Sequence, residues 1–344
     1  MADRIRVGIV GTGFGAKVQA PAFALHPRFE TVAIAAPNSA AATGKQRNIP
    51  HAFASVAEML SGVELDLVSV ASPPFDHHAS VMAALAAGKH VICEKPFALN
   101  LAQAEAMTAA AEAAGVVNAL GFEFRTVPAI RALVELAVNG HLGALRQIEV
   151  AQLSGELREA NTDRARGWWF ERERGGGLGN SMMPHFFDLA TQLAGRAAGA
   201  TTGLLRTANP QRTDAAGPFT STVADGAFAL VDYGDGLVAR VNVDGTSIVD
   251  STTVAIHGER RSAIASGPSL TDLAVFTIDS EEQDELEIAP SPYAKHAVIS
   301  KSVVPYLALL DQLAAAIDLG TPGIATFADG LAVQQQLAAI GYTA

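Results

Sequence analysis

The sequence is poor in the residues on which disulfide-bonded, membrane-spanning and nucleic-acid-binding proteins depend. It holds one cysteine, Cys93, in 344 residues, so no disulfide can form within the chain. Lys and Arg number 24 against 35 for Asp and Glu, which gives a formal net charge of -11, and no basic patch offsets this excess. Because nucleic-acid affinity rests on clustered Lys and Arg, we expect no nucleic-acid partner.

Long hydrophobic runs are missing as well. No window approaches the roughly 18 consecutive apolar residues of a membrane span, and the amino terminus lacks the apolar stretch of a signal peptide. Cys93 falls in a predicted strand, where a small buried hydrophobe is a simpler interpretation than a reactive thiol. We therefore expect a cytoplasmic protein with no membrane partner.

Strand-like and helical segments alternate in the first third of the chain. Short apolar, β-prone runs with helical patterns between them predict strands at residues 5–10, 31–35, 67–71, 90–93 and 117–121. Asn100 and Gln103 resemble a capping box, and Gly115 is a stop signal for the helix that follows them. This alternation predicts an α/β domain over residues 1–121, built on a doubly wound parallel sheet.

Strands follow strands after residue 122. One more helix is predicted over residues 128–139, and β-type runs lie at residues 145–153, 200–207, 223–231, 238–243, 252–256 and 275–278. Gly234-Asp235-Gly236 is a hairpin-type turn. We expect an α+β domain over residues 122–344, with a large, mainly antiparallel open sheet and helices on one face. A second copy of the chain would cover the other face, so we expect a homodimer or homotetramer through this sheet.

A Gly-rich turn follows the first strand and opens a helix. Gly11, Gly13 and Ala16 fill the three positions of the G-x-G-x-x-G/A pattern, in which glycine permits a tight turn and close approach of a pyrophosphate. This context favours a dinucleotide-binding Rossmann domain over a purely structural turn. The predicted cofactor contacts in the turn are Gly11, Thr12, Gly13, Phe14 and Gly15.

The acidic residue expected at the end of the second strand is missing. Ala36-Pro37-Asn38-Ser39 occupies that place, and no Asp or Glu lies between Glu30 and Glu58. Asn38 and Ser39 can donate hydrogen bonds, and no carboxylate repels a 2′-phosphate. We therefore expect NADP in preference to NAD, the alternative being that these are ordinary surface residues.

Glu94-Lys95-Pro96 ends the apolar run at residues 90–93. Residues just past the carboxyl ends of parallel strands line the ligand crevice of open α/β sheets, so Lys95 is expected to face the cofactor. The alternative for Lys95 is a surface lysine. His77 and His78 are adjacent, and no acidic or cysteine cluster completes a metal site, so no metal is expected.

Several landmarks together resemble the glucose-fructose oxidoreductase, inositol dehydrogenase and rhizopine-catabolism (Gfo/Idh/MocA) family. They span nearly the whole chain and comprise Gly11-Thr12-Gly13, Ala71-Ser72-Pro73-Pro74 with His77, Gly88 to Pro96, Gly121 to Arg125, Gly175-Gly176-Gly177, Pro184 to Asp188, and Ala325 to Leu331. The resemblance implies a Rossmann domain and an open-sheet domain that mediates oligomerisation. It also implies an NAD(P)-dependent oxidoreductase acting on a sugar, cyclitol or related polyol or keto compound.

The resemblance implies roles for individual residues. Lys95 would hydrogen-bond the reacting hydroxyl, and His185 would act as general acid or base. Pro184 is placed at the first turn of a helix, so that Asp188, three residues after His185, can orient the ring. A capping histidine beside a solvated aspartate is the alternative. Further cofactor contacts are expected at Ser72, Pro73, His77, Glu94 and Lys95.

One departure concerns the expected carboxylate four residues before His185. Ser181 stands there, and neither it nor Asn180 can accept a proton near neutral pH. Other substrate candidates are Glu123, Arg125, Arg166, Trp168 and Trp169, with core or interface packing as the alternative for the tryptophans. The competing hypothesis for the whole chain is a non-catalytic, cofactor-binding sensor or regulatory protein of the same family, such as the yeast galactose-regulon repressor.

Overall fold

The computed structural model describes residues 3–279 and 282–342 of the chain. The chain forms two compact units, one of Met1–Glu123 with Ser291–Leu331 and one of Phe124–Pro290 with Ala332–Ala344. This differs from a single division between residues 121 and 122. Residues 291–331 belong with the first unit because α8 (Val303–Leu319) buries Val303, Leu307 and Leu310 in one core with Val7 and Phe23.

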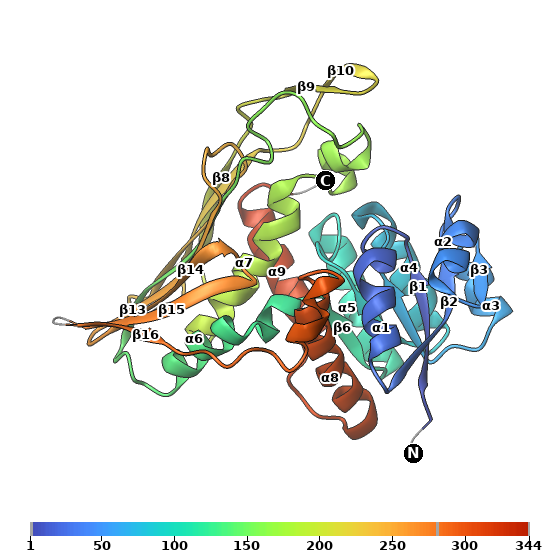
Figure 1. Cartoon of the computed structure of the whole chain (residues 1–344), viewed down its shortest axis with the longest axis horizontal. Helices are drawn as coiled ribbons and strands as arrows, with labels where there is room; N and C mark the ends of the chain where they lie inside the picture. Colours follow the sequence, from blue (N-terminus) through green and yellow to red (C-terminus); the bar gives the residue numbers. More distant parts are fainter. Residues whose placement is uncertain (1–2, 280–281, 343–344) are drawn as a thin grey trace. The chain divides into compact units, whose positions relative to one another are not determined.

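The first unit contains a six-stranded parallel sheet in the order β3-β2-β1-β4-β5-β6, which confirms the doubly wound fold (Figure 1). Its strands are β1 (Ile5–Val10), β2 (Phe29–Ala35), β3 (His51–Phe53), β4 (Leu67–Val70), β5 (His90–Cys93) and β6 (Asn118–Leu120). Strand β3 was not predicted, because its three residues are largely exposed and form no apolar run.

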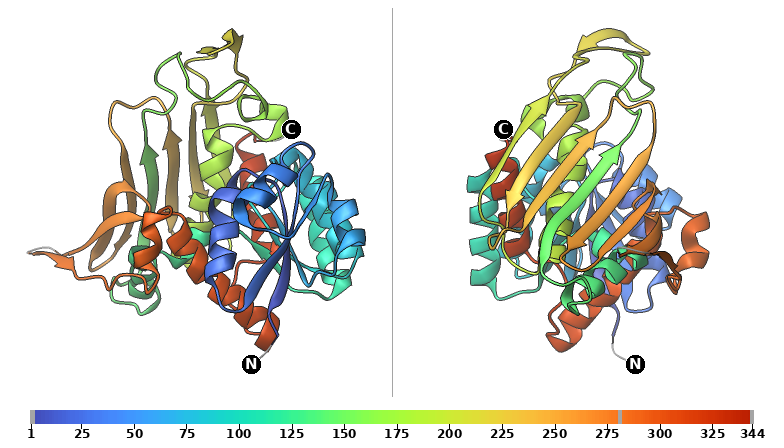
Figure 2. Two further views of the ribbon diagram at one scale, coloured as in Figure 1. Left: turned by 45° about the vertical axis from the view of Figure 1, so that its right-hand side comes forward. Right: turned by 90° about the vertical axis from the view of Figure 1, so that its left-hand side faces the viewer.

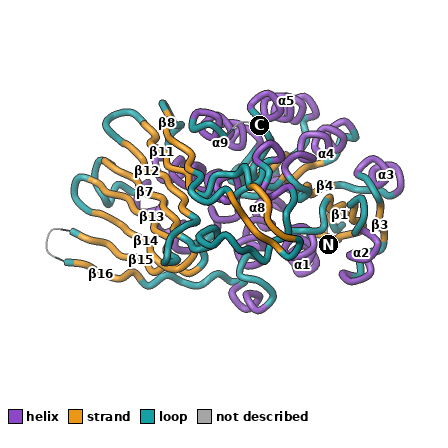
Figure 3. Tube along the Cα trace, turned by 90° about the horizontal axis from the view of Figure 1, so that it is seen from above, coloured by secondary structure: helices purple, strands orange, loops and turns teal. Residues whose placement is uncertain are grey.

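Helices lie on both sides of this sheet. They are α1 (Ala20–Leu25), α2 (Ala40–Arg47), α3 (Val56–Gly62), α4 (Pro74–Ala86) and α5 (Leu101–Ala114). Figure 3 shows α3, α4 and α5 on one side of the sheet and α1 and α2 on the other. The capping box is confirmed, because the Gln103 backbone N–H donates to Asn100 Oδ1 over 3.1 Å. Gly115, at φ 63°, ends the same helix as expected.

The second unit contains an eight-stranded sheet in the order β16-β15-β14-β13-β7-β12-β11-β8 (Figure 3). All neighbouring pairs are antiparallel except β7 with β12, so the predicted open sheet is confirmed. The strands are β7 (Leu145–Leu153), β8 (Thr201–Arg206), β11 (Gly226–Asp232), β12 (Val238–Asp244), β13 (Ser251–Gly258), β14 (Ser262–Ser269), β15 (Asp272–Ile278) and β16 (Gln283–Leu286). A separate hairpin joins β9 (Gln211–Asp214) and β10 (Gly217–Thr220).

Helices cover one face of the large sheet. In this unit α6 (Pro128–Val138) packs on β13, β14 and β15, and α7 (Leu178–Ala194) packs on β7, β11 and β12. Figure 2, in its right-hand view, shows the opposite face without a covering helix. The last helix, α9 (Phe327–Ala339), follows α8 after a break near Gly320. Among the residues that the structure describes, no helix has the length and apolarity needed to cross a membrane.

The expected start of the helix that carries His185 is wrong. Pro184 was placed in its first turn, but α7 begins at Leu178 and Pro184 lies inside it. The helix starts earlier because Gly177, at φ 101°, ends the preceding Gly-rich turn and the next residues already follow the helical pattern. His185 and Asp188 still share this helix.

Candidate active site

The Gly-rich turn after β1 has the shape that a dinucleotide phosphate requires. Gly11 adopts φ 105°, and a Cβ at this position would lie 2.3 Å from the Ala71 carbonyl oxygen. A Cβ on Gly13, in contrast, would meet no atom within 4 Å. The first glycine is therefore needed for the fold of the turn, whereas the second leaves its backbone accessible. This is the division of roles that pyrophosphate binding demands.

Neighbouring side chains support the turn. The Phe14 ring packs edge-on against Tyr306, with 6.0 Å between ring centroids, and Gly15 fits against the Ile9 side chain. Thr12 Oγ1 lies 2.6 Å from Ser39 Oγ and so connects the turn to the loop after β2. Exposed Asn38 precedes that contact. The predicted residues after β1 and β2 thus lie together at the carboxyl ends of these strands.

The loop after β4 contributes a polar atom to the same edge of the sheet. The Ser72 hydroxyl oxygen is buried and has no hydrogen-bond partner among the residues that the structure describes. Such an atom fits a cofactor polar group, because a buried hydroxyl is costly without a partner. Pro73 follows as the residue before α4.

His77 contacts the loops after β4 and β5. Its Nδ1 lies 2.9 Å from the Pro96 carbonyl oxygen, and its Nε2 lies 2.9 Å from the Ser72 carbonyl oxygen. Burial lowers the pKa of this imidazole, which favours the neutral ring. His77 lies between the loops after β4 and β5, and the one N–H of its neutral ring can donate to either the Pro96 or the Ser72 carbonyl group.

Lys95 and Glu94 follow β5, as predicted. Glu94 is buried, and its backbone N–H donates to the Val70 carbonyl oxygen over 2.8 Å, while the half-buried Lys95 precedes Pro96 across a cis peptide bond. Gln19 Nε2 donates to Glu94 Oε1 over 2.8 Å, and Ser69 Oγ donates to Gln19 Oε1 over 2.8 Å. Glu94, the residue before Lys95, therefore belongs to a buried network of polar side chains with Gln19 and Ser69.

Glu123 extends this network. Burial and the Glu123 charge together raise the pKa of Glu94 to about 8, against the opposing effects of Lys95 and Gln19. Burial likewise raises the pKa of Glu123 to about 7, with Lys95 opposing. Two buried carboxyl groups and one amine thus share a single low-dielectric region, an arrangement that concentrates at functional sites.

His185 lies on α7 in the second unit and is buried. Its ring centroid is 4.4 Å from that of Phe124. Asp188, expected to orient this ring, binds Arg125, whose Nε donates to Oδ2 over 2.8 Å and whose Nη2 contacts Oδ1. A guanidinium offers two parallel donors to a carboxylate, which explains why Arg125 occupies both oxygens.

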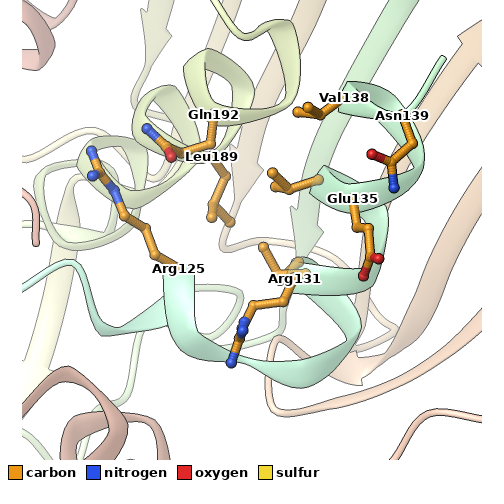
Figure 4. A pocket seen from close by; sticks show the side chains of 9 residues that line it. Arg125, Arg131, Glu135, Val138, Asn139, Leu189 and Gln192 are labelled. Carbon is orange, nitrogen blue, oxygen red and sulfur yellow. The ribbon is translucent and has the colours of Figure 1, made fainter. Parts of the chain in front are cut away.

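Arg125 also borders a pocket of about 380 Å³ between α6 and α7. Figure 4 shows Arg125 near Gln192 and Leu189 of α7, with Arg131 and Glu135 coming from α6. His185 is not among the described residues that line this pocket.

The remaining substrate candidates are held by other parts of the second unit. Ser181 Oγ donates to the Gly177 carbonyl oxygen over 3.0 Å. Arg166 binds Asp214 on β9, with 2.7 Å between Nη2 and Oδ1, and thereby lowers the pKa of that carboxyl. Trp169 is buried edge-on to Phe170 beneath the Arg164 guanidinium, while Trp168 is half-buried. Packing, the alternative weighed for the tryptophans, describes Trp169 best.

Two family models match most of the chain. Residues 5–122 match an oxidoreductase family with an NAD-binding Rossmann fold, and residues 130–264 match the GFO/IDH/MocA C-terminal domain. An uncharacterized oxidoreductase from Synechocystis is 31% identical over 277 residues, which cover 78% of this chain and 73% of that protein. The chain belongs to the GFO/IDH/MocA oxidoreductase family.

Other proteins resemble this chain over most of its length. The 1,5-anhydro-D-fructose reductase of Ensifer adhaerens is 27% identical, over 85% of this chain and 84% of the reductase. A levoglucosan dehydrogenase in complex with NADH superposes with a TM-score of 0.85 at 22% identity, over 98% of this chain and 96% of that one. A super-repressor mutant of Gal80p from Saccharomyces cerevisiae superposes with a TM-score of 0.83 at 19% identity, over 98% of this chain and 95% of that one. These superpositions establish the shared fold.

The predicted site of this GFO/IDH/MocA family member did not include three buried polar residues near Glu94. Gln19, Ser69 and Tyr306 are fully buried in the first unit, and burial raises the pKa of the Tyr306 phenol well above its ordinary value. The one signal in the sequence is a glutamine on the apolar side of the helical segment after Gly15. Ser69 and Tyr306 gave no signal, because single polar residues in apolar runs are common. In the described part of the chain, no group of three or more His, Cys, Asp or Glu residues could hold a metal ion.

Proposed function

We propose that this chain is an NAD(P)-dependent oxidoreductase that transfers a hydride between nicotinamide and a sugar, cyclitol or related polyol or keto compound. The observation that carries the proposal is Lys95, which follows β5 on the same sheet edge as the accessible backbone of Gly13. Family members named for action on levoglucosan and 1,5-anhydro-D-fructose support this substrate class.

Each candidate residue has a physically suitable role. The Lys95 amine can hydrogen-bond the reacting oxygen and stabilise its developing negative charge. The His185 imidazole, whose ordinary pKa is near neutral, can donate or accept a proton at that oxygen. Gly11 to Gly15 and the Ser72 hydroxyl would hold the dinucleotide through backbone and hydroxyl groups. Asp188 would act indirectly, by fixing Arg125 next to the helix that carries His185.

The preferred cofactor is NADP. The end of β2 offers Asn38, Ser39 and the Thr12 to Ser39 hydroxyl pair, with Lys45 and Arg47 in the last turn of α2. None of these groups repels a 2′-phosphate. A direct comparison of Michaelis constants for NADPH and NADH tests this preference, and equal values or a lower value for NADH would contradict it.

The working form is a homodimer or homotetramer assembled through the large sheet, in a cytoplasmic setting that suits the single buried Cys93. The open face of β8, β11 and β12 exposes Leu204 and Leu230 around a hollow of about 420 Å³. Apolar residues gathered on one sheet face favour a covered interface.

Mutation of Lys95 tests the activity directly. With NAD⁺ and levoglucosan, or NADPH and 1,5-anhydro-D-fructose, Lys95→Ala should lower turnover by about a hundredfold or more, while cofactor fluorescence still reports normal binding. Lys89→Ala, at a lysine of the same unit that is half-buried like Lys95, is the matched control. Unchanged turnover in Lys95→Ala would remove the assigned role.

The second candidate is a cofactor-binding regulator, favoured by Ser181 in place of a carboxylate on α7. Tight binding of NADPH without oxidation by any keto sugar in a broad panel would support the regulator and contradict the enzyme.

A further inference from the structure

The loops after β5 and β6 bring two buried acids beside one amine. Cys93 pairs with Leu120 across these parallel strands, and the Gly121 backbone N–H donates to the Cys93 carbonyl oxygen over 2.8 Å. Glu94 and Glu123 follow on the two sides of this connection and are 5% and 3% exposed. Residue 121 is glycine, and a Cβ there would lie 2.8 Å from Glu94 Oε1, so a larger residue would displace this carboxyl group.

The charge balance of this cluster leaves room for a proton. Lys95 can neutralise one carboxylate, and a second buried carboxylate beside the first is unfavourable. The other groups that surround Glu94 are uncharged: the Gln19 amide, the Ser69 hydroxyl, and the Cys93 thiol and Tyr306 phenol, whose pKa values burial raises. The pKa values of about 8 and about 7 at Glu94 and Glu123 agree with one proton held by the pair near neutral pH.

We propose that Glu94 and Glu123 share one proton and exchange it with the Lys95 amine, so that Lys95 can take up or supply the proton of the reacting hydroxyl. The inference rests on the proposed function, in which Lys95 holds the substrate oxygen. The two glutamates do not themselves contact substrate in this scheme; they position and reset Lys95.

The proton exchange balances in both directions. During oxidation the substrate O–H bond breaks and an Nζ–H bond forms on Lys95, while another Nζ–H bond breaks and its proton joins a carboxylate oxygen of the pair. The hydride leaves the substrate carbon for the bound cofactor in the same turnover, so a carbonyl product, a reduced cofactor and one proton account for all atoms and electrons. During reduction the pair returns its proton to Lys95.

Infrared spectroscopy tests the shared proton without any turnover. Difference spectra between about pH 7 and about pH 9 should show the C=O band of a protonated carboxyl group in the unmodified protein at the lower pH. Glu123→Gln should make this band titrate at a lower pH than in the parent, because Glu94 then loses its negative neighbour while its burial remains. Glu105→Gln, an exposed change on α5, is the control and should retain the titration of the parent. Absence of the band in the unmodified protein would overturn the inference.

The pH dependence of kcat/KM tests the exchange with Lys95. Glu123→Gln should lower kcat/KM by about a hundredfold near neutral pH and remove one ionisation from the profile, with cofactor binding unchanged. Glu123→Asp retains a carboxyl group and should restore the ionisation. A Glu123→Gln profile that keeps the shape of the parent profile would show a merely structural role. Failure of the proposed function has a different result, because the unmodified protein would then transfer no hydride at all. That result would also contradict the proton exchange with Lys95.

Discussion

Arg125 binds the carboxylate of Asp188 through Nε and Nη2, and Asp188 lies one helical turn after His185 on α7. Both side chains are largely buried, at 12% and 3% exposure. This ion pair fixes the segment before α6 against α7, while the role of Asp188 in orienting His185 stays a prediction.

Removal of one member of this pair should destabilise the protein. Asp188→Asn leaves the Arg125 guanidinium partly buried without its counter-charge, and such changes cost about 3–5 kcal/mol. Urea unfolding followed by circular dichroism measures the loss. Glu171→Gln breaks the exposed pair with Arg174 and should cost less than about 1 kcal/mol. Equal effects of the two substitutions would contradict a structural role for the Arg125 to Asp188 pair.

The two glycines of the cofactor turn should respond differently to alanine. Gly13→Ala places a methyl group in open space, so thermal stability should change little while NADPH affinity falls by about tenfold or more. Gly11→Ala forces the residue at φ 105° and meets the Ala71 carbonyl group, so the protein itself should be destabilised by more than about 1 kcal/mol.

Thermal unfolding and fluorescence titration together separate these two effects. A Gly13→Ala protein that binds NADPH as well as the parent would show that the phosphate does not approach this backbone.

Parts of this site could be predicted from sequence because their signals are local. The predicted strand at residues 90–93 coincides with β5, and the Gly-rich turn directly follows β1. Lys95 and Gly13 were therefore placed at the carboxyl ends of their strands, where the structure has them. Asn100, Gln103 and Gly115 also delimit α5 through contacts with near neighbours in sequence.

Contacts between residues far apart in the sequence could not be predicted in this way. Arg125 and Asp188 are 63 residues apart, and Gln19 and Glu94 are 75 apart, so nothing in one segment indicates the other. The residues of β9 and β16 are polar and lack the apolar alternation by which strands are predicted. The place of residues 291–331 in the first unit could not be predicted for a similar reason, since a helical pattern does not reveal which core its apolar face joins.

The buried carboxyl pair should make stability depend on pH. Folding raises the pKa of Glu94 to about 8 and that of Glu123 to about 7, both from 4.5, so the folded protein binds more protons than the unfolded chain in this window. Their contribution is complete below about pH 4.5 and is lost as the pH rises to about 8. The free energy of unfolding in the unmodified protein should therefore fall between about pH 5 and about pH 8.

Glu123→Gln removes one of the two titrating groups and lowers the pKa of the other, which stays buried, so this fall should become smaller. Glu105→Gln should leave it intact, because that side chain is exposed. Urea titrations at both pH values provide the comparison. A fall of the same size in all three proteins would assign the pH dependence to other groups.

A charge on the open sheet face should block assembly. Leu230 lies on β11, is 49% exposed, and stands opposite Thr202 and Arg240 on the neighbouring strands. Leu230→Glu would bury a carboxylate in any interface formed there, which costs several kcal/mol unless the charge is paired. Leu319→Glu, at the end of α8 and 78% exposed, introduces the same charge away from the sheet. Light scattering after size exclusion should give a smaller particle for Leu230→Glu, whereas Leu319→Glu should match the parent. An unchanged mass for both would place the subunit interface elsewhere than on β8, β11 and β12.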